Sequence, residues 1–281
     1  MSAVLVKGVL WGALGLGLLW LVLAAFMYFF QRKLQYSPPP GPLPSPEEAG
    51  LPEVSPVTLR TEDGLDLVAW YRAASAGAPT VILFHGNAGH LGDRATKARF
   101  FLDAGLGVLL VEWRGFAGNP GNPSEAGLLA DGRAALSFLR SQGLSPDHWV
   151  FYGESLGSGV AFQLAAEEPG PVAIVTEGAF TSAVDVGSRR YPLFPVRLLM
   201  RDRFSSLDIL PSLSMPLLVL HGQQDKVVPP DMGKRLAEVF PGPVETFFPS
   251  EGRHVDLFDH GAGPIMEAFL KRYVPMGRPN R

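Results

Sequence analysis

The stretch that decides the fold reads Trp149-Val150-Phe151-Tyr152-Gly153-Glu154-Ser155-Leu156-Gly157-Ser158-Gly159. Its apolar beginning predicts a buried β-strand, and the residues from position 156 onward predict a helix. Between them lies the pattern Gly-x-Ser-x-Gly, in which a serine occupies a strained, tight turn from strand to helix. Glycines are needed there because the helix packs against the strand without room for side chains. Ser155 is therefore a candidate nucleophile; the alternative is a structural serine in such a turn.

Short apolar runs lie on both sides of this stretch and alternate with helical ones. The apolar runs occupy residues 81–84, 108–111, 150–152, 172–175 and 217–220, and the helical stretches lie near 94–104, 124–140, 156–167 and 231–240. This alternation is typical of a mostly parallel sheet with helices on both faces. Upstream, the runs 57–60 and 65–71 flank Glu62-Asp63-Gly64 and predict a hairpin. The sequence therefore predicts an α/β fold.

The first 33 residues predict a membrane anchor. No residue from Gly8 to Phe30 is charged, and at 1.5 Å per residue such a helix is about 34 Å long, against roughly 30 Å of bilayer hydrocarbon. A cleaved signal peptide is the alternative, but the apolar run is longer than the hydrophobic region of such peptides. We expect a single transmembrane helix within residues 1–33 that contacts the lipid bilayer through residues 8–30.

The orientation of this anchor stays open. Lys7 and the N-terminal amine lie on one side of it, and Arg32 and Lys33 lie on the other, so the positive charges are balanced. Residues 34–50 are rich in proline and predict a stiff linker that holds the rest of the chain off the bilayer. We expect one globular domain at residues 51–281. Its segment 178–215 predicts a cap-like excursion, because its prolines and arginines are unsuited to a sheet strand.

Composition excludes several classes of protein. The chain has 281 residues, of which 47% are hydrophobic and 18% charged, so it is too apolar to be disordered. It contains no cysteine, which excludes thiolate nucleophiles and zinc-thiolate sites. The net charge of −3 and the absence of an arginine-rich run argue against nucleic acid as a partner.

A serine nucleophile needs two further groups. Its hydroxyl must give its proton to a base within hydrogen-bond reach, and a carboxylate must orient that base. Asp225 follows the strand predicted at 217–220, and His254 follows the strand predicted at 245–248. Both loops should lie at the same sheet edge as Ser155, so Asp225 and His254 are the candidate acid and base. Glu177, after the preceding strand, is the alternative acid.

Two further groups of residues are expected around this serine. The backbone N–H groups of Leu156 and Asn87 are the candidate oxyanion hole, because two such donors must face the charge that develops in a tetrahedral intermediate. Within the apolar segment 191–200, Leu193, Phe194 and Leu198 are the candidate substrate-binding residues, in a groove suited to an acyl chain. The alternative for this segment is ordinary packing of a cap against the sheet.

Several motifs together resemble one superfamily over about residues 29–275. They are Phe30-Gln31-Arg32-Lys33-Leu34-Gln35-Tyr36, His85-Gly86-Asn87-Ala88-Gly89, Trp113-Arg114-Gly115-Phe116, Pro123-Ser124-Glu125-Ala126-Gly127, the Gly-x-Ser-x-Gly turn, Tyr191-Pro192, Asp202-Arg203-Phe204 and the two loops that carry Asp225 and His254. With these motifs the chain resembles the α/β-hydrolase superfamily, and more closely its single-pass, membrane-anchored serine hydrolases. That group includes protein depalmitoylases and is similar to serine aminopeptidase-like hydrolases.

The resemblance implies an α/β-hydrolase fold preceded by a transmembrane helix. It also implies a membrane-anchored serine hydrolase that cleaves carboxylic ester or thioester bonds through a Ser-His-Asp triad and an acyl-enzyme, without metal or organic cofactor. The implied partners are an acyl ester or thioester, borne by a lipid or an acylated protein, and the bilayer. Two alternatives stay open: an aminopeptidase-like amide hydrolase, and a non-catalytic, membrane-tethered scaffold on the same fold.

Overall fold

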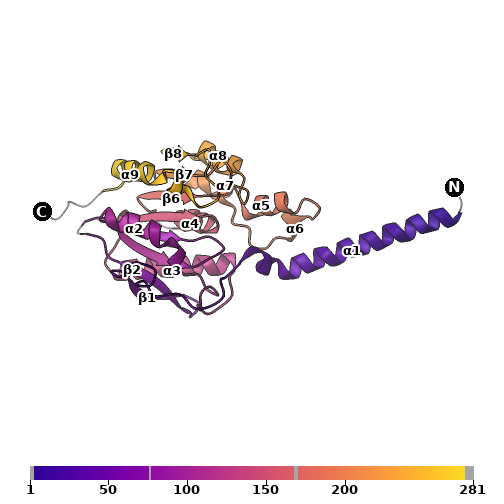
Figure 1. Ribbon diagram of the computed structural model, residues 1–281, viewed down its shortest axis with the longest axis horizontal. Helices are drawn as coiled ribbons and strands as arrows, with labels where there is room; N and C mark the ends of the chain where they lie inside the picture. The colour runs from indigo at the N-terminus through magenta and orange to yellow at the C-terminus, as the bar shows by residue number, and fades with distance from the viewer. Residues whose placement is uncertain (1–2, 76, 168–169, 276–281) are drawn as a thin grey trace.

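One twisted sheet forms the centre of the molecule in a computed structural model that describes residues 3–75, 77–167 and 170–275 (Figure 1). Within these residues it has eight strands in the order β1-β2-β4-β3-β5-β6-β7-β8. The strands are β1 Ser55–Arg60, β2 Asp66–Arg72, β3 Thr80–Phe84, β4 Gly107–Val111, β5 Trp149–Glu154, β6 Ala173–Glu177, β7 Leu217–Leu220 and β8 Val244–Phe247. Strand β2 pairs antiparallel with both β1 and β4. The six strands β3 to β8 are parallel to one another. The predicted α/β fold class is confirmed.

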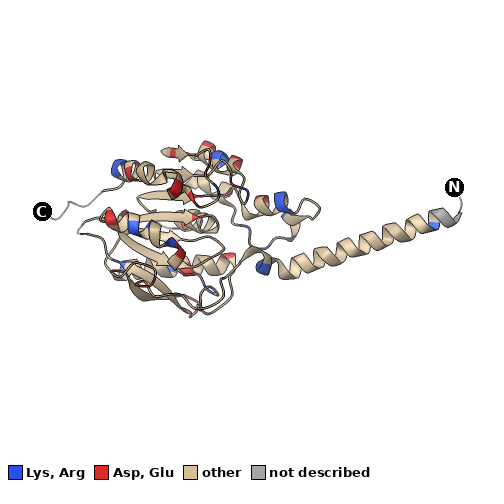
Figure 2. Ribbon diagram, viewed as in Figure 1, with Lys and Arg blue, Asp and Glu red and all other residues tan. Residues whose placement is uncertain are grey.

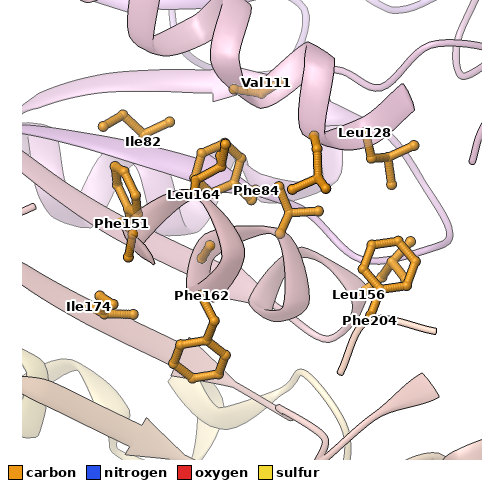
Figure 3. Packing of buried hydrophobic residues seen from close by; sticks show 14 of the residues in the cluster. Ile82, Phe84, Val111, Leu128, Phe151, Leu156, Phe162, Leu164, Ile174 and Phe204 are labelled. Carbon is orange, nitrogen blue, oxygen red and sulfur yellow. The ribbon is translucent and has the colours of Figure 1, made fainter. Parts of the chain in front are cut away.

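Helices cover both faces of this sheet, which is why its central strands are apolar throughout. On one face α3, α4 and α8 pack over a cluster that contains Ile82, Phe84 and Phe162 (Figure 3). On the other, α2 and α9 pack over a cluster that contains Val81 and Leu83. Alternate residues of β3 thus serve the two clusters, as the period of a strand requires. The helices are α2 Ala95–Asp103, α3 Glu125–Ser141, α4 Leu156–Glu167, α8 Pro230–Val239 and α9 Ala262–Tyr273.

A smaller layer lies over the carboxyl end of the sheet. It consists of α5 Ala183–Arg190, α6 Val196–Leu199 and α7 Ser206–Ile209, all within the predicted excursion at 178–215. The short helices α5 and α6 are joined by a turn with Pro192 and Pro195, residues that prevent one continuous helix. We call α5, α6 and this turn the cap.

The N-terminal helix α1, Ala3–Gln35, projects from the globular part (Figure 1). Within the described residues it is the one helix long and apolar enough to span a membrane, over Val6–Gln35. Its charged residues are confined to its two ends (Figure 2). The structure therefore contains a candidate transmembrane helix where the sequence predicts one.

The start of the segment that follows α1, where the sequence predicts a stiff linker over residues 34–50, contacts the domain. Two nitrogens of Arg32 lie 2.8 and 3.0 Å from the carboxylate oxygens of Asp202. The Tyr36 side chain is 2% exposed, and its hydroxyl donates to the same carboxylate at 3.1 Å. Next along the chain, the backbone N–H of Ser37 donates to the carbonyl of Asn87 at 2.9 Å. The physical reason is that a buried carboxylate needs partners, and the end of α1 supplies them.

Candidate active site

Ser155 lies in the turn between β5 and α4 with φ +49°, a left-handed conformation that is strained for a residue with a side chain. The turn can form because its neighbours are glycines. A Cβ at Gly157 would lie 1.9 Å from the carbonyl oxygen of Phe84, and one at Gly153 would lie 2.5 Å from Cα of Ser158. The strand and helix thus approach as the motif predicts, and the serine is held at the carboxyl edge of the sheet.

Three of the predicted site residues come together at this edge. The Nε2 atom of His254 lies 2.8 Å from Oγ of Ser155, and its Nδ1 atom lies 2.7 Å from Oδ2 of Asp225. Asp225 is in the loop after β7, and His254 is in the loop after β8. A proton can therefore pass from the serine hydroxyl to an imidazole whose other nitrogen is held by a carboxylate.

The carboxylate of Asp225 is held in its ionised form. Burial of this side chain would raise its pKa, but hydrogen bonds from His221 and His254 outweigh burial and hold the pKa well below its usual range. The other oxygen, Oδ1, accepts hydrogen bonds from the backbone N–H groups of Val227 and Val228 at 2.8 and 2.9 Å. His221 places its Nε2 atom 3.2 Å from Oδ2. These contacts fix the carboxylate that faces the base.

Glu177, the alternative acid, is buried and engaged elsewhere. Its Oε2 accepts hydrogen bonds from Tyr152 and from Nζ of Lys97, the latter at 2.5 Å. Its Oε1 accepts from the backbone N–H of Leu257 at 3.2 Å. The structure therefore brings Asp225, and not Glu177, to His254.

A buried charge network underlies the serine turn, and sequence reasoning missed it. Glu154 contacts the guanidinium of Arg94 through Oε1 and Nζ of Lys97, at 2.7 Å, through Oε2. Burial would raise the pKa of Glu154, but Lys97 and Arg94 hold it below its usual value. Lys97 also contacts Glu177, so the network joins the ends of β5 and β6 to α2. The sequence feature that could have indicated this network is the pair of basic residues Arg94 and Lys97 at the start of α2, a helix that covers the sheet.

This network predicts an acid-dependent stability. Because the pKa of Glu154 is lowered from 4.5 on folding, its stabilisation is complete above that value and is lost as the pH falls below it. Glu154→Gln should cost about 3–5 kcal/mol of unfolding free energy at pH 7, because it removes the buried carboxylate that Arg94 and Lys97 share. Its Tm should also fall less steeply than that of the wild type under acid.

Thermal unfolding between pH 7 and pH 3 measures both effects. Glu238→Gln, which removes an exposed carboxylate at the end of α8, is the matched control and should follow the wild type. If Glu154→Gln and wild type unfold at the same temperature at pH 7, the network contributes no stability.

The candidate oxyanion hole lies beside Ser155. Leu156 is the first residue of α4, where backbone N–H groups lack partners within the helix. Asn87 is in the loop after β3, and its side-chain Nδ2 donates to the carbonyl of Gln35 at 2.8 Å. At Gly86 an added Cβ would lie 3.3 Å from Cβ of Ser155, so this loop approaches the nucleophile closely. The end of α1 therefore helps to hold the loop that carries Asn87.

A pocket of about 450 Å³ opens over Ser155 between the cap, the Asn87 loop and α1. Among the predicted substrate-binding residues, Phe194 lines it. Leu193 and Leu198 do not; these residues are 79% and 83% exposed. The lining residues are Met27, Tyr28, Gln31, Leu34, Gln35, Asn87, Ser155, Leu156, Phe180, Ala183, Val186, Gly187, Arg190, Tyr191, Phe194, Val196, Leu199, Met200, Lys226, Val227 and Val228.

One wall of this pocket comes from α1, which the sequence did not predict. Its residues Met27, Tyr28, Gln31, Leu34 and Gln35 recur at the spacing of one helix face. Gln31 fixes that face against the cap: its Nε2 donates to the carbonyl of Leu199 at 3.1 Å, and its Oε1 accepts from the backbone N–H of Arg201 at 2.7 Å. The sequence feature that could have indicated this wall is Gln31, a polar residue directly after the apolar run. Among the described residues, no group of three His, Asp or Glu side chains is placed to hold a metal ion.

Comparisons with known proteins agree with this fold. A family model described as the alpha/beta hydrolase fold matches residues 79–204. An uncharacterized protein of Mycobacterium tuberculosis is 41% identical over 214 residues, which cover 75% of each chain. Protein bem46 of Schizosaccharomyces pombe is 33% identical over 225 residues, again 75% of each chain.

A solved structure shows the same fold. The esterase Pf2001 of Pyrococcus furiosus aligns with a TM-score of 0.68 at 22% identity, over 86% of this chain and 100% of that one. At this identity the likeness speaks for the fold alone. Together with the sequence relatives, it leads to one conclusion: the chain belongs to the α/β-hydrolase family.

Proposed function

We propose that this protein is a membrane-anchored serine hydrolase that cleaves carboxylic ester or thioester bonds of acyl substrates through an acyl-enzyme. The observation that carries the proposal is the contact of Ser155 with His254, and of His254 with Asp225, at 2.8 and 2.7 Å, where Ser155 lines the pocket. The esterase fold of Pf2001 supports the same reaction class by analogy.

The reaction follows from these positions. His254 takes the proton of the Ser155 hydroxyl as Oγ attacks the carbonyl carbon, and Asp225 stabilises the imidazolium that forms. The N–H groups of Leu156 and Asn87 bind the oxyanion. His254 then gives the proton to the departing alcohol or thiol, which leaves the acyl group on Oγ. Water, deprotonated by His254, attacks this ester and releases the acid and the free serine.

The pocket lining favours an acyl chain as the bound group. Most of its side chains are apolar, among them those of Met27, Leu34 and Phe194. The charged residues among the described lining are Arg190 and Lys226, both cationic. An aminopeptidase-like site needs a carboxylate for the substrate amine, so the lining disfavours the amide alternative. An acyl group on a lipid or a protein fits this pocket better.

We also propose that α1 is retained as a single-pass anchor within residues 1–33, ahead of the globular domain at 51–281 with its cap. The side of the membrane that this domain faces stays open. Retention is supported by the contacts of α1 with the domain, since Arg32 pairs with Asp202 and Gln31 with the cap. Removal of a signal peptide inside α1 would shorten a helix that forms a wall of the pocket.

The acyl pocket predicts a dependence on chain length. Each added CH₂ that is buried contributes about 0.8 kcal/mol, so kcat/KM should rise roughly fourfold per methylene until the pocket is full. Phe194→Asp should lower kcat/KM for long-chain esters far more than for acetyl esters, because it puts a charge on the pocket wall. Rates on a series of ester and thioester substrates, with Ser155→Ala as the blank, measure this.

Val68→Asp is the matched control, since it places the same charge at an exposed position on β2. It should leave the chain-length profile unchanged. A flat profile in the wild type, or equal losses on short and long esters in a folded Phe194→Asp protein, would contradict an acyl-binding pocket.

A further inference from the structure

The turn between α5 and α6 exposes apolar side chains to an unusual degree. We call residues 191–198 the cap tip. Leu193 and Leu198 are 79% and 83% exposed, more than any other large hydrophobic side chain that the structure describes outside α1. Exposed apolar groups that sit together at the end of a projecting element mark an interaction surface.

The cap tip contacts α1 through Trp20. The ring of Phe194 stacks on the indole of Trp20, with centroids 6.0 Å apart and planes 7° from parallel. Nε1 of Trp20 donates a hydrogen bond to the carbonyl of Leu193 at 2.9 Å. These two contacts fix the level along α1 at which Leu193 projects.

That level falls inside the bilayer when α1 spans it. Lys7, the charge at one end, belongs at one surface of the hydrocarbon. About 20 helical residues cross roughly 30 Å, so the hydrocarbon reaches from Gly8 to about Met27. A tilted helix needs more residues to cross the same thickness. Trp20 lies about 10 Å from the Met27 end of that stretch. A cap tip held at Trp20 is therefore placed among the acyl chains, about 10 Å from the nearer boundary with the headgroups.

The backbone of the cap tip suits an apolar surrounding. Pro192 and Pro195 have no N–H group, the N–H of Phe194 donates to the carbonyl of Tyr191 at 3.1 Å, and that of Leu198 donates to Pro195 at 2.9 Å. Such internal pairing is what hydrocarbon demands of a polypeptide. The one charged residue of the tip, Arg197, pairs with Asp185 on α5 at 2.7 Å.

The same two elements also wall the pocket. Phe194 of the cap tip and Met27 of α1 both line the cavity above Ser155. We propose that the cap tip is a second membrane contact, which enters the bilayer beside α1, and that acyl chains pass from the bilayer into the pocket between the tip and α1. The membrane contact stands independently; the entry route rests on the proposed hydrolase function.

The absence of native cysteine allows a direct test on the full-length chain. Leu193→Cys and Leu198→Cys, each labelled with an environment-sensitive NBD dye, are placed in phosphatidylcholine nanodiscs that contain doxyl-labelled lipid. Lys271→Cys on α9, at the opposite end of the molecule, is the aqueous control, and Leu14→Cys on α1 is the membrane control (Figure 1). We expect blue-shifted emission and doxyl quenching at the cap tip. Dyes at 193 and 198 that behave like the dye at 271 would overturn the membrane contact.

Turnover tests the entry route. Leu193→Ser combined with Leu198→Ser should lower kcat/KM for a long-chain ester in nanodiscs by roughly tenfold, since two leucines lose their apolar surrounding. Hydrolysis of a water-soluble short ester should match the wild type. Unchanged long-chain turnover, with the tip dyes still quenched, would overturn the route alone. A wild type that is inactive on both esters refutes the hydrolase proposal, while the dye result still decides the membrane contact.

Discussion

Ser155→Ala is expected to lower kcat on an activated short ester by about a millionfold. The loss is this large because the alanine removes the oxygen atom that attacks the carbonyl carbon. The reaction that remains is direct attack by water, with the oxyanion stabilised by the backbone donors. A spectrophotometric ester assay on purified full-length protein in detergent measures it. The expected residual rate is close to the background of the assay.

His254→Ala supplies the matched comparison. It should cost about as much, and the double variant with Ser155→Ala should lose nothing further, because nucleophile and base act as one unit. Circular dichroism on each variant excludes unfolding as the cause. Near-wild-type activity in the folded Ser155→Ala protein would show that the mechanism is wrong.

Asp225→Asn is expected to lower kcat by about ten-thousandfold, a milder loss than either of these. The amide keeps the shape of the side chain but removes the negative charge that faces His254 at 2.7 Å. The amide can also donate a hydrogen bond to Nδ1 of His254, where the carboxylate accepts one. This favours the imidazole tautomer whose Nε2 carries the proton and cannot act as the base. The decrease should appear in kcat, because the lost charge stabilises the imidazolium that forms in the transition state.

Glu177→Gln is the control that separates the two candidate acids. Its carboxylate contacts Lys97 and Tyr152 and does not reach the base, so the variant should retain kcat and instead lose Tm. The reverse pattern, with Glu177→Gln inactive and Asp225→Asn active, would assign the acid role to Glu177.

The fold and the central contacts were predictable because each rests on a local pattern. Apolar runs of three to four residues define buried strands, and the glycines around Ser155 define a turn that only small residues permit. Asp225 and His254 follow from the rule that loops after parallel strands meet at one edge. That rule left Glu177 open, since it also ends a strand; the deciding fact is its contact with Lys97 on a helix.

What could not be predicted depends on contacts between distant segments. An apolar helix looks the same in sequence whether lipid surrounds it or one of its faces lines a pocket, so the role of Met27 was hidden. The docking of Tyr36 depends on a carboxylate at position 202. Leu193 lies in a turn between two helices and is exposed. The sequence does not predict this exposure, because the spacing of apolar residues indicates a buried face only within a helix or a strand.

The central claim, that Ser155 is a nucleophile activated by His254, is tested most directly by a fluorophosphonate, which phosphonylates such serines covalently. The full-length chain is treated with the reagent, digested and analysed by mass spectrometry. We predict one adduct, on Ser155, that forms at a rate strongly reduced in His254→Ala and is absent in Ser155→Ala. An adduct on a different serine, or equal labelling of Ser155→Ala and wild type, would contradict the account.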